Sequence, residues 1–94
     1  MLIFEWNPEK NDINFKKHGV SFEEAETVFE DERAVTIYDE NHSENEDRFI
    51  IIGMSRNLRE LTVCHCYRSK DEITRIISAR RATANEIKLY KRGI

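Results

Sequence analysis

Three segments with the composition of β-strands follow one another in the second half of the chain and are separated only by short turns. They cover residues 48–55, 58–67 and 72–81 and are rich in isoleucine, valine, threonine and other strand-forming residues. Antiparallel strands can be joined by a tight turn, whereas parallel strands need a crossover of about a dozen residues or more. The short turns therefore predict a mostly antiparallel sheet. Because 94 residues suffice for one hydrophobic core, we expect residues 1–94 to form a single domain.

Two helix start signals precede these strands. Asn7-Pro8 joins a favoured N-cap residue to a favoured first helical residue and predicts a helix over residues 8–18, with a glycine after it as the stop. Ser21, with Glu24 three residues later, has the pattern of a capping box and predicts a second helix. Two short helices joined by a glycine turn form an αα-hairpin.

The remaining segments complete the expected fold. Residues 2–6 and 34–38 are apolar or β-branched and are predicted to be strands. Thr83 and Glu86 have the capping-box spacing and predict a last helix that ends near Arg92. The predicted order is β-α-α-β-β-β-β-α. We therefore expect an α+β fold with a small, mostly antiparallel sheet, an N-terminal αα-hairpin and a C-terminal helix.

The last predicted strand carries an unusual set of polar residues, namely Arg75, Ser78, Arg80 and Arg81. A buried strand needs apolar residues but no guanidinium groups, and an arginine on a rigid strand is well placed to hold a phosphate. Strict alternation places Ser78 and Arg80 on one face, and Arg75, Ile77 and Arg81 on the other. The alternative is that these arginines pair with the chain's own carboxylates.

The chain has three histidines, whose side chains exchange protons near neutral pH. His18 ends the first predicted helix, where it is either a catalytic candidate or a residue that only interacts with the helix dipole. His65 lies in a strand among apolar neighbours, as either a base or a core residue. His42 lies in an acidic loop and is expected to be solvated.

Other kinds of site are not expected. Cys64 and Cys66 are two residues apart on one predicted strand, which puts both side chains on one face and is a poor arrangement for a disulfide. We expect reduced thiols, no metal site and no cofactor, because His65 points to the other face and no glycine-rich phosphate loop is present. No segment has the length of a membrane span and the N-terminus lacks a signal-peptide pattern, so we expect a cytoplasmic protein.

The net charge of −3 conceals an uneven distribution along the chain. Residues 1–55 hold 5 basic and 14 acidic residues, a net charge of −9, and residues 56–94 hold 10 and 4, a net charge of +6. Such a distribution is typical of a protein with separate surfaces for anionic and cationic partners, although charges can also be scattered over the folded surface.

Three sequence blocks resemble the BrnT toxin family. They are residues 4–10 (FEWNPEK), residues 14–25 (NFKKHGVSFEEA) and residues 75–83 (RIISARRAT), followed by Glu86 and Tyr90. The blocks cover most of the chain and occur in the order of the family. One difference is Asn7, where the family more often has aspartate; both residues cap helices.

The resemblance implies a RelE-like ribonuclease toxin of a type II toxin–antitoxin system, which cleaves RNA without a metal and inhibits translation. It also implies a BrnA-like antitoxin as the partner in a hetero-oligomer. Operator DNA would be bound only through the DNA-binding part of the antitoxin.

The resemblance also gives expectations for individual residues. The residues that match the family's motifs and are expected to be catalytic are His18, Arg75, Ser78, Arg80 and Arg81. The expected RNA-binding residues are Lys16, Lys17 and Arg68. Weaker candidates for proton transfer are His65, Tyr67 and Tyr90.

Three functions agree with these observations. The first is the ribonuclease toxin, in which arginines hold a phosphate and a histidine moves protons. The second is a non-catalytic binding module, or an inactive homologue of the toxin, that only pairs with an antitoxin. The third is a nucleic-acid binder without nuclease activity, whose affinity would depend on salt.

Overall fold

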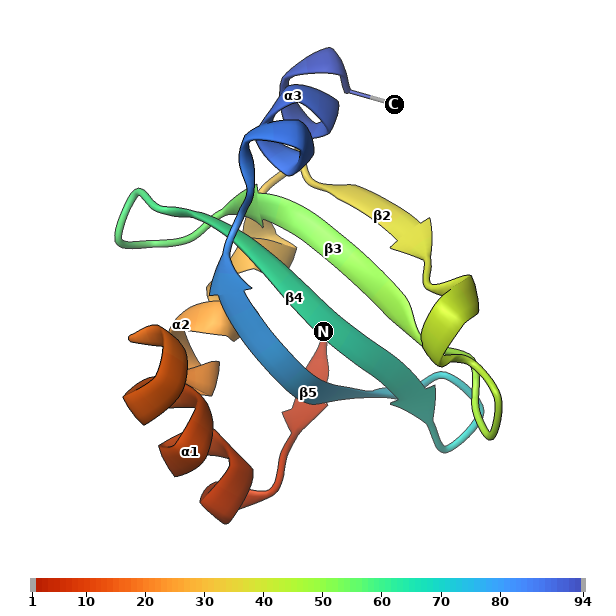
Figure 1. The fold of residues 1–94 in the computed structure, drawn as a ribbon. Helices are drawn as coiled ribbons and strands as arrows, with labels where there is room; N and C mark the ends of the chain where they lie inside the picture. Colours follow the sequence, from red (N-terminus) through yellow and green to blue (C-terminus); the bar gives the residue numbers. More distant parts are fainter. Residues whose placement is uncertain (1, 94) are drawn as a thin grey trace.

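A five-stranded sheet with the order β1-β5-β4-β3-β2 forms the centre of the molecule (Figure 1). The computed structural model describes residues 2–93. The strands are β1 (Ile3–Glu5), β2 (Val35–Tyr38), β3 (Phe49–Met54), β4 (Glu60–Arg68) and β5 (Ile73–Arg81). Strands β2 to β5 pair with one another in antiparallel fashion, and β1 pairs with β5 in parallel. The predicted mostly antiparallel sheet is confirmed.

The helices begin and end at the local signals that predict them. They are α1 (Pro8–His18), α2 (Phe22–Glu26) and α3 (Ala84–Arg92), with the 3₁₀ turns η1 (Thr27–Glu30) and η2 (Glu40–His42). The Asn7 side chain accepts the first free N–H groups of α1, and Gly19 ends the helix at a φ of 69°. Thr83 and Glu86 form both hydrogen bonds of a capping box at the start of α3. The predicted order of elements is confirmed.

The hydrophobic core lies between one face of the sheet and the two N-terminal helices. We call this face the helix face; its buried side chains are Ile51, Leu61, Val63, Ile76 and Ala79. Val20, Phe22, Ala25 and Val28 pack against it and are 0% exposed. Figure 1 shows α1 beside β5, α2 behind the sheet and α3 standing at the upper end. The opposite face, which we call the open face, carries Ile50, Cys64, Ser78 and Arg80.

Helix α1 is attached to β5 by a buried amide and not by an apolar stripe. Asn14 is 7% exposed, whereas Ile13 and Phe15 of the same helix are 62% and 57% exposed. The Asn14 Nδ2 donates to the carbonyls of Val20 and Ala79, each at 2.8 Å, and Oδ1 accepts the Ala79 N–H at 3.1 Å. Since β1 pairs with residues 73–75, no strand formed by residues 2–93 lies beside the rest of β5 on that side. Asn14 satisfies its backbone there.

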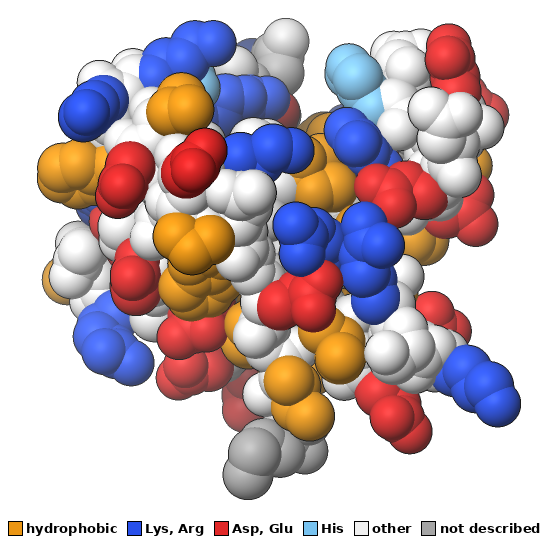
Figure 2. Space-filling model, turned by 90° about the horizontal axis from the view of Figure 1, so that it is seen from below, with side chains coloured by type: hydrophobic (Ala, Val, Ile, Leu, Met, Phe, Trp, Pro, Cys, Tyr) orange, Lys and Arg blue, Asp and Glu red, His pale blue; other side chains and the backbone are white. Residues whose placement is uncertain are grey.

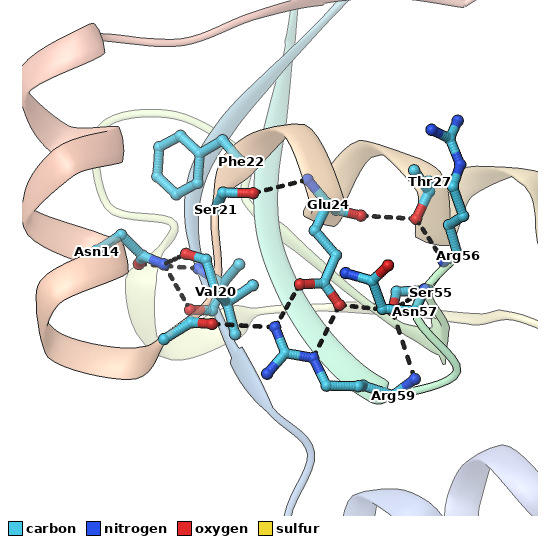
Figure 3. Close-up of polar contacts among 12 residues, drawn as sticks. Asn14, Val20, Ser21, Phe22, Glu24, Thr27, Ser55, Arg56, Asn57 and Arg59 are labelled. Carbon is cyan, nitrogen blue, oxygen red and sulfur yellow. Dashed lines mark hydrogen bonds and ion pairs between the residues drawn. The ribbon is translucent and has the colours of Figure 1, made fainter.

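The turn between β3 and β4 is joined to α2 by a second polar cluster (Figure 3). Glu24 accepts from Arg59 Nε at 2.9 Å, from Arg59 Nη2 and from the Ser55 hydroxyl at 2.7 Å. Arg59 hydrogen-bonding is the main reason that the pKa of Glu24 is lowered. The N–H of Glu24 donates to Ser21 Oγ at 3.0 Å, as in a capping box. The Glu24 carboxylate binds Arg59 in place of completing the predicted box, because Arg59 offers a charged donor.

A β-bulge interrupts the ladder between β4 and β5. Cys64 pairs with Ser78, whereas the next residue, His65, pairs with Ile76. Ile77 is therefore the extra residue in β5. Strict alternation of side chains, which assumes an unbroken ladder, does not hold across this point.

The bulge brings Arg75 to the open face. Arg75 pairs with Cys66, which lies on the same face as the other cysteine of β4, and therefore shares the face of Ser78 and Arg80. Ile77 lines the same pocket as Ser78 and Arg80. The prediction that Arg75 and Ile77 lie opposite Ser78 and Arg80 is wrong, because the sequence carries no local signal for the extra residue.

We expect Asn14→Ala to lower the free energy of unfolding by about 2–4 kcal/mol, because it leaves a buried N–H and two buried carbonyls without partners. Urea unfolding measures this effect. The neighbouring, exposed Ile13→Ala is the control and is expected to cost less than about 0.5 kcal/mol. Equal losses in the two variants would contradict the role of the Asn14 amide.

Candidate active site

A pocket of about 220 Å³ opens on the open face of the sheet. Side chains of β3, β4 and β5 form its floor, and the η2 segment forms its wall. The groups in it that can carry charge or exchange a proton are Asp39, His42, Arg48, Cys64, Ser78 and Arg80. Ligand pockets for whole small molecules are commonly about 300–1,000 Å³, so this pocket is smaller than most of them.

Arg80 is held in the pocket by Glu86 of α3. Its Nη1 and Nη2 donate to Glu86 Oε1 and Oε2 at 2.7 and 2.9 Å. Glu86 Oε1 also accepts from the Thr62 hydroxyl at 2.9 Å and from the Thr83 N–H at 2.8 Å. The hydrogen bonds from Arg80, followed by that from Thr83, lower the pKa of Glu86 to about 2 despite its burial. The pair fixes the orientation of Arg80 and offsets part of its charge.

Arg48 is the second cation of the pocket. Its N–H donates to Ser43 Oγ at 3.0 Å, and its carbonyl accepts the Asp39 N–H at 2.8 Å. Its Nε lies 3.5 Å from Glu46 Oε2, too poorly placed for a hydrogen bond. Within residues 2–93 this buried atom has no hydrogen-bond partner. A buried guanidinium donor without a partner is uncommon.

His42 and Asp39 complete the pocket. His42 Nδ1 lies 2.9 Å from Asp39 Oδ2, with side chains that are 66% and 11% exposed. The sequence predicts a solvated histidine at this position. It does not predict that His42 and Ser78 line one pocket, because the two residues are far apart along the chain. The spacing of Asp39 and His42, three residues apart in one turn, is the signal that could have identified the pair.

The end of the open face below the pocket carries a chain of ion pairs. Glu5 of β1 accepts from Arg75 at 2.7 Å and lies 3.8 Å from Arg68, and Arg68 reaches Glu46 at 3.3 Å. Figure 2 shows basic and acidic side chains interleaved over this end of the molecule. Arg75 thus shares the face of Ser78 and Arg80 but is partly neutralised by Glu5. Arg68, an expected RNA-binding residue, is 47% exposed next to it.

Other predicted site residues lie away from the pocket. Arg81 pairs with Leu61 and is therefore on the helix face. His18 is one helical turn after Asn14 on α1, which packs on the far side of β5. Lys16 and Lys17 are exposed on the same helix. The structure does not bring these four residues together with Ser78 and Arg80.

The weaker candidates for proton transfer have structural partners. His65 is 0% exposed on the helix face, where burial lowers its pKa, and its Nε2 lies 3.1 Å from the Tyr67 hydroxyl. Tyr90 of α3 donates to Asp31 at 2.6 Å, and this hydrogen bond is the main cause that raises the pKa of Tyr90 to about 12. The Tyr90 contact joins α3 to Asp31, whereas His65 and Tyr67 are neighbours two residues apart on β4.

Three further properties concern the part of the chain that the structure describes. Cys64 and Cys66 are free thiols, and burial raises the pKa of each. Residues 2–93 contain no cluster of three or more histidine, cysteine or acidic side chains arranged to hold a metal ion. No helix in this range has both the length and the apolar character of a membrane span.

The fold and the pocket together define a small α+β protein with a site suited to an anionic group such as a phosphate. The model of a family described as "Ribonuclease toxin, BrnT, of type II toxin-antitoxin system" matches residues 6–86, and the chain belongs to this family. The predicted membership is confirmed. Membership of a type II toxin–antitoxin family implies an antitoxin as partner.

A solved structure supports the fold. The crystal structure of the Brucella abortus ribonuclease toxin BrnT, at 1.1 Å resolution, superposes with a TM-score of 0.66 and 24% sequence identity. The match covers 88% of this chain and 99% of that chain. No curated protein matches the sequence.

We expect Glu86→Gln to lower the free energy of unfolding by about 1–2 kcal/mol at pH 7, a value reduced for the solvent exposure of Arg80. Because folding lowers the pKa of Glu86 from 4.5 to about 2, the ion pair stabilises the protein fully above about pH 4.5. This contribution is lost as the pH falls through about 2. The difference between wild type and variant should therefore shrink between these two pH values.

Urea unfolding at several pH values measures this difference, with the exposed Glu72→Gln as the control. A difference that stays constant down to pH 2 would show that the Glu86 carboxylate does not stabilise the fold through its ionisation.

Proposed function

We propose that this chain is an endoribonuclease toxin that cleaves RNA without a metal, inhibits translation and is neutralised by a BrnA-like antitoxin. The observation that carries the proposal is the pocket on the open face. Ser78 and Arg80 of β5, which we call the basic strand, lie there with Arg48. The family is described as ribonuclease toxins, which gives the class of activity. The residues of the pocket could perform RNA cleavage in the way described next.

RNA contains its own nucleophile for this reaction. The 2′-hydroxyl attacks the adjacent phosphorus, so the protein needs to align the two groups, move protons and stabilise the added negative charge. The guanidinium group of Arg80 is held by Glu86 before substrate binds, which reduces the reorganisation needed during the reaction. Ser78 is exposed in the same pocket as Arg80 and Arg48 and can donate its hydroxyl to a phosphate oxygen.

The RNA would continue from the pocket along the open face. Arg75 and Arg68 lie in this direction and form a shared ion-pair network with Glu5. Phosphates could replace Glu5 as the partner of these guanidinium groups. Lys16 and Lys17 are exposed on α1 and would contact only an RNA long enough to reach past β5.

The proposed antitoxin would act by covering the open face. A BrnA-like protein with acidic side chains would pair with the same arginines that hold RNA, and would form a hetero-oligomer with the toxin. Contact with operator DNA would come only through the antitoxin. We propose the cytoplasm as the place of action, since RNA and ribosomes are there.

The competing function is a binding module without catalysis. It is favoured by one observation: Arg75 and Arg80 are already paired with Glu5 and Glu86. In that case the arginines would order the surface that an antitoxin recognises. The two functions differ in whether RNA is cut.

The test is incubation of the purified, antitoxin-free protein with RNA and excess chelator. Wild type is expected to produce fragments with 2′,3′-cyclic phosphate and 5′-hydroxyl ends. Arg80→Ala should cut at least about 100-fold more slowly, because it removes a cation that stabilises the transition state. Glu86→Gln breaks the same ion pair but keeps the cation, and should lose less activity than Arg80→Ala. Lys10→Ala, an exposed cation on α1, is the control for loss of charge.

Intact RNA, both free and on translating ribosomes, would support the binding module. Cleavage that is equally fast in Arg80→Ala, shown to be folded by circular dichroism, would contradict the role of the pocket.

A further inference from the structure

The turn after β2 holds a histidine and a carboxylate over the basic pocket. His42 Nδ1 lies 2.9 Å from Asp39 Oδ2, and both residues line the pocket that contains Ser78 and Arg80. We propose that His42 is the general base of RNA cleavage and that Asp39 positions it. This inference rests on the proposed ribonuclease function and assigns its proton-transfer group.

Asp39 is fixed before the reaction. Its side chain is 11% exposed, and its N–H donates to the carbonyl of Arg48 at 2.8 Å across the hairpin from β2 to β3. Ser43 Oγ donates to the carbonyl of Asp39 and accepts the N–H of Arg48. Both backbone polar groups of Arg48, the residue before β3, are therefore bonded to this turn. The Asp39 carboxylate has a defined position as a result.

This position determines the state of the imidazole. An ionised carboxylate can only accept a hydrogen bond, so Nδ1 of His42 carries the proton that it shares with Asp39. The other ring nitrogen, Nε2, is then the one with a free lone pair. A buried carboxylate behind an imidazole holds its tautomer and stabilises the imidazolium that forms on proton uptake.

A second hollow of about 280 Å³ shares two lining residues, His42 and Arg48, with the pocket. Its other lining residues are two amides and two carboxylates, namely Asn41, Asn45, Glu44 and Glu46. A phosphate in the first hollow and the preceding nucleotide in the second would place the 2′-hydroxyl between them. Arg48 lines both hollows, and in this arrangement its guanidinium group would donate to a non-bridging oxygen of that phosphate.

The charges of Arg48 and Asp39 both act on the Cys64 thiol at the floor of the pocket. Its pKa is raised mainly by burial, and Arg48 and Asp39 act on it in opposite directions. The two charged groups are therefore close enough to influence one thiol on the pocket floor.

In the proposed cleavage step, Nε2 of His42 takes the proton from the 2′-hydroxyl, and the 2′-oxygen forms a bond to phosphorus. The bond between phosphorus and O5′ breaks with its electron pair on O5′, which takes a proton from water. The imidazolium returns its proton to solvent, and the products are a 2′,3′-cyclic phosphate and a 5′-hydroxyl. Arg48 and Arg80 stabilise the negative charge on the phosphorane oxygens.

The other two histidines are less suitable. His65 is 0% exposed in the aromatic core between Phe29 and Phe49. His18 is on α1, on the other side of β5 from Ser78. His42 is the histidine that shares a pocket with the basic strand.

Cleavage of a short RNA in chelator, measured from pH 5 to pH 8.5, tests the assignment. The wild-type rate should rise with pH as the imidazole loses its proton and should then level off. Besides His42, the groups facing this space that can titrate or carry charge are Asp39, Glu44, Glu46, Arg48, Cys64 and Arg80. His42→Gln should reduce the rate about 100-fold or more and remove this rise, while RNA affinity stays within about twofold.

Two further variants separate catalysis from structure. Added imidazole should restore cleavage by His42→Ala, an effect that a structural role would not give. Asp39→Asn should lower the rate about 10-fold or more, because the imidazole loses the carboxylate that orients its ring. Glu40→Gln, an exposed change in the same turn, should match wild type.

The outcomes distinguish this inference from the proposed function. If wild type cuts RNA and His42→Gln cuts it equally fast with the same pH dependence, the assignment of His42 is overturned and the ribonuclease function stands. A loss in His18→Gln without a loss in His42→Gln would also overturn it. If wild type cuts no RNA, free or on ribosomes, the ribonuclease function and this inference are both overturned.

Discussion

The pairing of the Asn14 amide with the peptide of Ala79 is the interaction on which the arrangement of this molecule depends. Strand β5 has a strand neighbour on its outer side for only three residues, and beyond them its backbone would be unpaired. Asn14 satisfies both polar groups of Ala79 and accounts for how a helix with an exposed apolar surface stays attached. Ser78 and Arg80 flank Ala79, so the same contact fixes the strand that carries the pocket.

The bulge at Ile77 determines which arginines act together. Without it, Arg75 would point to the helix face, where the core leaves no room for a guanidinium group. With it, Arg75 and Arg80 lie on the open face, each held by one carboxylate, Glu5 or Glu86. Such pairs orient the cations and reduce the net positive charge of the surface. Anionic ligands must therefore compete with these carboxylates, which favours ligands that offer several phosphates at once.

The open face is bounded by segments from distant parts of the chain. Helix α3 closes one end through the ion pair of Arg80 and the hydrogen bond from Tyr90 to Asp31. The η2 turn closes the side and brings His42 over the sheet. The site is thus assembled from β5, a hairpin loop and the last helix, and the proposed chemistry needs all three in place.

The sequence by itself determined the elements and their ends, because caps, glycine stops and hydrophobic patterns act within a few residues: Asn7, Gly19 and Thr83 are examples. It also identified the basic strand and the family. Only the tertiary structure decided which side chains meet. The bulge arises from the fit between two strands, and the Glu24 carboxylate binds Arg59, which is 35 residues away along the chain. His42 and Ser78 come to line the same pocket. These contacts depend on long-range packing, for which a local sequence pattern carries no signal.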